Sequence, residues 1–111
     1  MGVYNPGHQA VLDEMLSGYP QVRRGKLFGY PGYFALGKLC VCLYEDGIGV
    51  KLPQATVQRL IAEDAHAAPF QPLGRRSMRE WVQITLSRSE DYRDYAAILD
   101  ESIRYVTSLQ E

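Results

Sequence analysis

The alternation of apolar residues predicts a β-hairpin near the middle of the chain. Residues 39–52 hold two β-prone runs separated by Asp46-Gly47, a pair that tolerates the positive φ angles of a tight hairpin turn. Alternate residues of the first run face opposite ways, which predicts two sets: Leu39, Val41 and Leu43 on one face, and Cys40, Cys42 and Tyr44 on the other. Because both sets are apolar, we expect an interior strand of the sheet.

Further strands are predicted on both sides of this hairpin. Residues 22–28 form a β-prone run, and residues 28–34 combine aromatic residues with glycine and proline, which indicates a bend or bulge between strands. Residues 33–36 predict a strand that joins the central one through a short loop at Gly37-Lys38. An antiparallel meander is expected. Residues 70–73 predict at best an edge strand, and residues 81–86 a further strand.

Apolar residues spaced three and four apart predict two amphipathic helices. The first starts with Asn5 as N-cap and Pro6 at the first helical position, and its apolar stripe is His8, Val11, Leu12, Met15, Leu16 and Tyr19. The second starts at Pro53 and is expected to turn three apolar residues toward the sheet: Val57, Leu60 and Ile61. We interpret His8 as a packed or capping residue.

A third helix is predicted from about Ser89 to Leu109, after a capping box formed by Ser87 and Glu90. Its apolar positions cover more than the arc of about 100° that a one-sided surface helix needs. The helix therefore either lies in a groove of the same chain or contributes to a homodimer. Together the patterns predict one α+β domain over residues 1–111: an antiparallel β-meander sheet packed by an N-terminal helix, a middle helix and a long C-terminal helix.

Composition places the chain among ordinary globular proteins. The 111 residues are 46% hydrophobic and 23% charged with a net charge of -1, so no global attraction to nucleic acid or to an anionic membrane is expected. Neither a membrane span nor a signal peptide is indicated, and we expect a cytoplasmic protein. Cys40 and Cys42 are expected as reduced, buried thiols, and the spacing of cysteine and histidine predicts no metal site.

The basic residues are the most informative candidates for a binding surface. They form two groups, Arg23, Arg24 and Lys26 before the central strands, and Arg75, Arg76 and Arg79 after them. If the two groups met, they would form a positive surface for phosphate groups or an acidic partner. The alternative is that these side chains pair with acidic helix faces and contribute solubility. With a net charge of -1, any binding to nucleic acid is expected to be weak and sensitive to salt.

No catalytic constellation is predicted, and no cofactor is expected. The acidic pairs fall at predicted helix ends, on helix faces or at a turn, where solvated surfaces explain them. Gly47-Ile48-Gly49 is half of a glycine-rich fingerprint, but it sits in a hairpin rather than at a strand-to-helix turn. An enzyme or a small-ligand domain, with the bend at residues 28–34 as a pocket wall, is the third hypothesis and needs a deep cavity there.

The order of five short motifs resembles the TfoX N-terminal domain family, small bacterial domains related to the Sxy competence regulators. The motifs are Lys26-Leu27-Phe28-Gly29-Tyr30, Gly32-Tyr33-Phe34-Ala35 with Gly37-Lys38, the Asp46-Gly47 hairpin, Pro69-Phe70, and Gly74-Arg75 leading to Met78 and Trp81. The resemblance implies an α+β domain with a regulatory, non-enzymatic role. The longer competence regulators carry a second, C-terminal domain. Because the sequence ends at Glu111, directly after the last predicted helix, we expect a stand-alone domain here. A looser likeness to the YjbR-type fold keeps nucleic acid as an alternative.

The leading hypothesis from sequence is therefore a regulatory domain that binds a macromolecular partner, most simply a protein. The runner-up is a weak nucleic-acid binder that uses the two basic groups. Neither the partner nor the regulated process follows from the residues.

Overall fold

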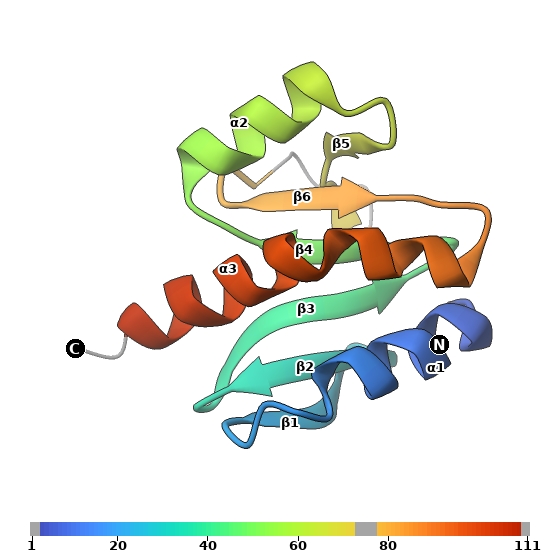
Figure 1. Ribbon diagram of the computed structural model, residues 1–111, viewed down its shortest axis with the longest axis vertical. Helices are drawn as coiled ribbons and strands as arrows, with labels where there is room; N and C mark the ends of the chain where they lie inside the picture. Colours follow the sequence, from blue (N-terminus) through green and yellow to red (C-terminus); the bar gives the residue numbers. More distant parts are fainter. Residues whose placement is uncertain (1–2, 73–77, 110–111) are drawn as a thin grey trace.

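A six-stranded antiparallel sheet forms the frame of the molecule (Figure 1). In this computed structural model, which describes residues 3–72 and 78–109, the strand order is β1-β2-β3-β4-β6-β5. The strands are β1 (Val22–Leu27), β2 (Tyr30–Ala35), β3 (Lys38–Tyr44), β4 (Gly47–Lys51), β5 (Ala67–Pro69) and β6 (Trp81–Ile84). The first four strands form the predicted meander, and β6 returns to pair with β4.

The helices gather on one face of this sheet, as Figure 1 shows for α1 and α3 in front of the strands. Their bounds are α1 (Pro6–Leu16), α2 (Gln54–Glu63), the 3₁₀-helix η2 (Ser89–Tyr95) and α3 (Ala96–Ser108). The main core lies between these helices and the sheet, and it includes Leu12, Ile48, Val50 and Ile103, each at most 1% exposed. This arrangement confirms the predicted α+β class.

Helix α1 begins as the sequence predicts. The Asn5 side chain accepts hydrogen bonds from the backbone N–H groups of Gly7 and His8 at 2.8 and 3.2 Å, which satisfies two donors that the first helical turn leaves free. Pro6 occupies the first helical position. His8 is 1% exposed, as the packing interpretation requires.

The second and third helices depart from prediction in detail. In α2, Val57 is buried and Leu60 packs against the core, but Ile61 is 36% exposed and the buried neighbour is Thr56, which donates a hydrogen bond to Glu101 at 2.7 Å. The predicted capping box does not form, because the last helical segment opens as a 3₁₀-helix that has Arg88 as N-cap and no side-chain cap.

The wide apolar stripe of the last helix is largely accounted for within the chain. The α3 residues Leu99, Ile103 and Val106 are buried, and Tyr95 and Ile98 pack against the same core. Leu109 remains 42% exposed. The groove formed by the sheet and the other helices thus covers most of the stripe, and a homodimer stays a prediction.

Two of the hairpin turns place both central residues at positive φ. Phe28 and Gly29 have φ of 52° and 85° between β1 and β2, and Leu36 and Gly37 have φ of 51° and 85° between β2 and β3. These are the backbone values of a type I′ turn, whose twist matches the flanking strands. The observed loop, Leu36-Gly37, therefore begins one residue earlier in the sequence than the predicted loop at Gly37-Lys38.

The β3–β4 turn also differs from prediction. The strands pair from Tyr44 to Gly47, which leaves Glu45 and Asp46 as the loop. The positive φ, 52°, is found at Glu45 and not at Asp46 or Gly47. Gly47 lies within β4 instead. The predicted edge strand at residues 70–73 is likewise replaced by β5 (Ala67–Pro69), and Leu73 lies outside the described residues.

A β-bulge in β3 changes which residues face the helices. Tyr33 pairs with Val41 and Phe34 pairs with Leu39, which leaves Cys40 as the extra residue. The extra residue reverses the alternation of side chains beyond it. Cys40 therefore joins the helix-covered core, whereas Leu39 lies with Cys42 and Tyr44 on the opposite face. The predicted faces of Leu39 and Cys40 are wrong for this reason.

Candidate ligand-binding pocket

The described helices leave the second face of the sheet open, and a hollow of about 310 Å³ lies on it. We call this the open face. Its small hydrophobic cluster is separate from the main core and contains the buried residues Cys42, Tyr44 and Phe70. A volume of this size is at the lower end of the roughly 300–1,000 Å³ that is typical of small-molecule sites.

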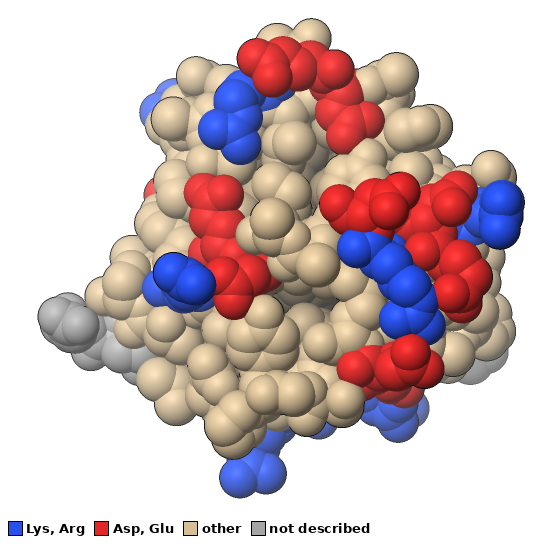
Figure 2. Space-filling model, in the orientation of Figure 1, with Lys and Arg blue, Asp and Glu red and all other residues tan. Residues whose placement is uncertain are grey.

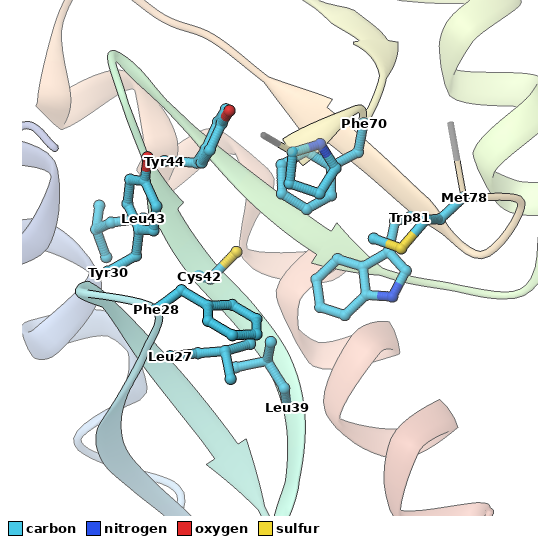
Figure 3. A pocket seen from close by; sticks show the side chains of 11 residues that line it. Leu27, Phe28, Tyr30, Leu39, Cys42, Leu43, Tyr44, Phe70, Met78 and Trp81 are labelled. Atoms are coloured by element: carbon cyan, nitrogen blue, oxygen red, sulfur yellow. The ribbon is translucent and has the colours of Figure 1, made fainter. Parts of the chain in front are cut away.

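Side chains from distant parts of the sequence form the two walls of this hollow (Figure 3). Leu27 at the end of β1 and Phe28 in the β1–β2 turn stand on one side, and Phe70 and Trp81 stand on the other. The sulfur of Cys42 points between them from β3. We refer to this hollow as the aromatic slot, because aromatic rings bound it on both sides.

The aromatic side chains around the slot support one another. The ring centroids of Tyr30 and Tyr44 are 4.9 Å apart, those of Tyr44 and Phe70 are 5.4 Å apart, and those of Phe70 and Trp81 are 5.7 Å apart. Separations of about 4.5–7 Å are favourable for aromatic pairs. The four rings therefore form a continuous row in which each ring packs against the next.

Residues with a small side chain or none lie next to one another across four strands at the base of the slot. Gly25, Gly32, Cys42 and Gly49 are successive partners across β1, β2, β3 and β4. A Cβ atom on Gly49 would lie 2.9 Å from two ring atoms of Phe70 and 3.1 Å from the Cys42 sulfur, closer than ordinary van der Waals contact. The absence of a side chain at Gly49 is thus what allows the Phe70 ring to lie against the sheet.

Phe28 is the most exposed member of the slot. The residue is 76% exposed, and its backbone has a φ of 52°. A left-handed backbone costs a non-glycine residue about 1–2 kcal/mol, and an exposed phenylalanine gains little burial in return. Folding stability therefore gains little from phenylalanine at this turn.

The thiol in the slot is not set up as a nucleophile. Burial raises the pKa of the Cys42 thiol to about 12, and it raises the pKa of Cys40 to about 11. Because the thiolate is the reactive form of cysteine, both groups are unreactive at neutral pH. Cys42 therefore contributes a polarisable apolar surface to the slot.

The first basic group is divided between the two faces of the sheet. In β1, Leu27 reaches the slot, so alternation places Arg23 on the open face and places Arg24 and Lys26 on the helix face. Arg24 donates to Asp13 of α1 at 2.7 Å, with more than half of its side chain exposed. Arg24 therefore has the acidic partner that the solubility alternative expects.

Arg79 is the member of the second basic group that the structure describes, and its strand lies well apart from β1. Arg79 is exposed and precedes β6, which is separated from β1 by β2, β3 and β4. Four strand spacings of about 4.8 Å place these strands about 19 Å apart. Arg75 and Arg76 lie outside the described residues. The described members of the two groups thus lie on elements that are not adjacent in the sheet, and their role in binding stays a prediction.

The position of β1 offers a structural reason for its charges. β1 is an edge strand, and charged side chains on an edge discourage pairing with another chain. The opposite edge, β5, is three residues long and ends in Pro69, which has the same protective effect.

The helix-covered face carries many acidic side chains, among which individual basic ones lie (Figure 2). Arg93, for example, contacts Glu14 and Glu90, each at 2.8 Å. Carboxylates in this arrangement would repel a phosphate backbone, so the helix face does not favour nucleic acid.

Among the residues that the structure describes, buried His8 and partly buried Ser89 come closest to a catalytic pair. The His8 Nε2 atom lies 2.9 Å from the Asp46 carbonyl, which can only accept, so Nε2 carries a proton and donates. In the neutral ring, Nδ1 then accepts from the Ser89 hydroxyl at 2.7 Å. Because His8 is 1% exposed, we interpret the pair as a link between α1, the β3–β4 turn and η2.

Metal binding and membrane insertion find no support in the chain from 3 to 72 and from 78 to 109. Over those ranges, no three histidine, cysteine or acidic side chains are grouped so that they could hold a metal ion. Over the same ranges, no helix has the length and apolar character needed to span a bilayer.

The bend at residues 28–34, which the sequence offers as a pocket wall, contributes Phe28 and Tyr30 to the slot. No local sequence signal joins this bend to Phe70 and Trp81, which lie more than 35 residues away.

Comparison with protein-family models, with curated proteins and with solved structures gave no match to the chain.

Proposed function

We propose that this protein is a non-enzymatic binding domain and that the aromatic slot is its binding site. The observation that carries the proposal is an apolar hollow of about 310 Å³ on a sheet face that the described helices leave open. Exposed apolar walls are costly in water, and the binding of an apolar group recovers part of that cost.

The position of Phe28 supports the same proposal. Glycine would fit its backbone better and would remove an exposed ring, so phenylalanine at this turn favours binding over stability. The resemblance of the motifs to the TfoX N-terminal family supports a regulatory role for the domain, in which the bound group would act as a signal.

A protein partner is the second candidate for the bound group. Leu27, Phe28 and Met78 are 40%, 76% and 39% exposed around the slot. Large apolar side chains around a pocket are typical of surfaces that receive an anchoring side chain of another protein. This candidate requires that an apolar side chain occupy the slot.

Replacement of Phe28 with glycine tests the proposed site. The probe is the neutral compound naphthalene-2-carboxamide, and the readout is the indole N–H resonance of Trp81, the single tryptophan of the chain. Loss of one aromatic contact of about 0.5–1.5 kcal/mol weakens binding by about fivefold. The Phe28→Gly protein should be at least as stable as the parent, because the turn favours glycine.

Leu36→Gly is the matched control. Leu36 is also exposed, at 56%, and has a φ of 51° in the equivalent turn, but it lies outside the slot. Both glycine variants should gain similar stability, and only Phe28→Gly should bind the probe more weakly. Equal affinity in all three proteins, or no binding in any of them, would contradict the proposed site.

A further inference from the structure

A lysine lies next to one wall of the aromatic slot, outside the set of residues that line it. In β4, Ile48 and Val50 point into the helix-covered core, so alternation places Gly49 and Lys51 on the open face. Lys51 is the cross-strand partner of Trp81, whose side chain forms a wall of the slot. Its side chain is only 27% exposed. A partly buried positive charge therefore lies beside Trp81, at the margin of the apolar slot.

The charge of Lys51 is only loosely balanced. Its ammonium lies 3.9 Å from a carboxylate oxygen of Glu80, whereas the other ion pairs of the described residues are 2.7–2.8 Å long. At 3.9 Å the two groups share no direct hydrogen bond. A partly buried ammonium gains more from a nearby anion than a fully exposed one, because water screens the interaction less.

We infer that the aromatic slot takes a planar aromatic carboxylate, with its ring between Phe28 and Trp81 and its carboxylate against Lys51. The inference rests on the proposed function of the slot and deepens it. Among residues 3–72 and 78–109, the one ammonium placed beside the slot matches a singly charged acid. With respect to those residues, a phosphate would bring about two charges at neutral pH toward one lysine and the Glu80 carboxylate, which favours the carboxylate. The apolar walls in turn favour an aromatic body over a small hydrophilic acid.

Two charge substitutions with opposite effects test the inference. Affinities for naphthalene-2-carboxylate and for its neutral isostere naphthalene-2-carboxamide are measured through the Trp81 indole resonance. Lys51→Gln should weaken carboxylate binding by about fivefold, because it removes a charge-assisted contact. Glu80→Gln should strengthen it by about twofold, because it removes a nearby like charge. Neither variant should alter the affinity for the carboxamide, which carries no charge.

The results separate this inference from the proposed function. Opposite shifts for the carboxylate, with constant carboxamide affinity, support a carboxylate site. If both probes bind with equal affinity and neither substitution changes it, the carboxylate inference is overturned and the slot remains an apolar binding site. If neither probe perturbs Trp81 in the parent protein, both the inference and the proposed function are overturned.

Discussion

Replacement of Tyr92 with phenylalanine is expected to lower the free energy of unfolding by about 2–3 kcal/mol. The Tyr92 hydroxyl is fully buried, donates to the Ile84 carbonyl at 2.9 Å and accepts from the Leu86 N–H at 3.1 Å. Phenylalanine preserves the packing but leaves both backbone groups without this partner inside the core. Urea denaturation with an unchanged slope should show the loss as a lower midpoint.

Tyr19→Phe is the control for this prediction. Its hydroxyl donates to Asp100 at 2.8 Å, but both side chains reach solvent, so water can replace the lost bond. We expect a loss of less than about 1 kcal/mol. Similar losses in the two variants would show that the buried hydrogen bonds of Tyr92 do not hold the end of β6 to η2.

Replacement of Gly47 with alanine is expected to destabilise the protein by about 1–3 kcal/mol. A Cβ atom at this position would lie 2.6 Å from the Thr85 hydroxyl oxygen and 2.8 Å from the Ile84 carbonyl oxygen. Because the carbonyl belongs to the backbone of the neighbouring strand, the clash can be relieved only if β4 and β6 move apart. Thermal unfolding should show a lower midpoint temperature than in the parent protein.

Gly18→Ala is the matched control, because a Cβ atom there meets nothing within 4 Å. Gly18 is also exposed and has no positive φ. We expect its stability to be unchanged or slightly higher, since alanine restricts the unfolded chain. If Gly47→Ala were as stable as Gly18→Ala, the close approach of β4 to the end of β6 would be contradicted.

Local patterns were sufficient to predict much of the fold. The Asn5-Pro6 start of α1 and the meander both depend on neighbours in sequence, and the structure contains both. Gly47 shows the limit of this reasoning. The residue was expected for its freedom at a turn, but the structure requires it because β6 approaches it closely.

The site was harder to predict, because it depends on features with no local signal. The bulge at Cys40 moves Leu39 to the open face, and a strict two-residue alternation cannot show an extra residue. The sequence also could not show that the helices would leave the Cys42 face open. One usable signal for the turns was present in the sequence. Phe28-Gly29 and Leu36-Gly37 both end in glycine and are followed by β-prone residues, which is typical of two-residue hairpin turns.

The central claim is that the open face, and not the helix-covered face, is the binding surface. The most direct test is an NMR measurement of intermolecular contacts between isotope-labelled protein and unlabelled naphthalene-2-carboxylate. We predict nuclear Overhauser effects from the naphthalene protons to Phe28, Cys42, Phe70 and Trp81. Contacts to side chains of α1 or α3 instead, or no contacts at a concentration that saturates the Trp81 resonance, would contradict the account.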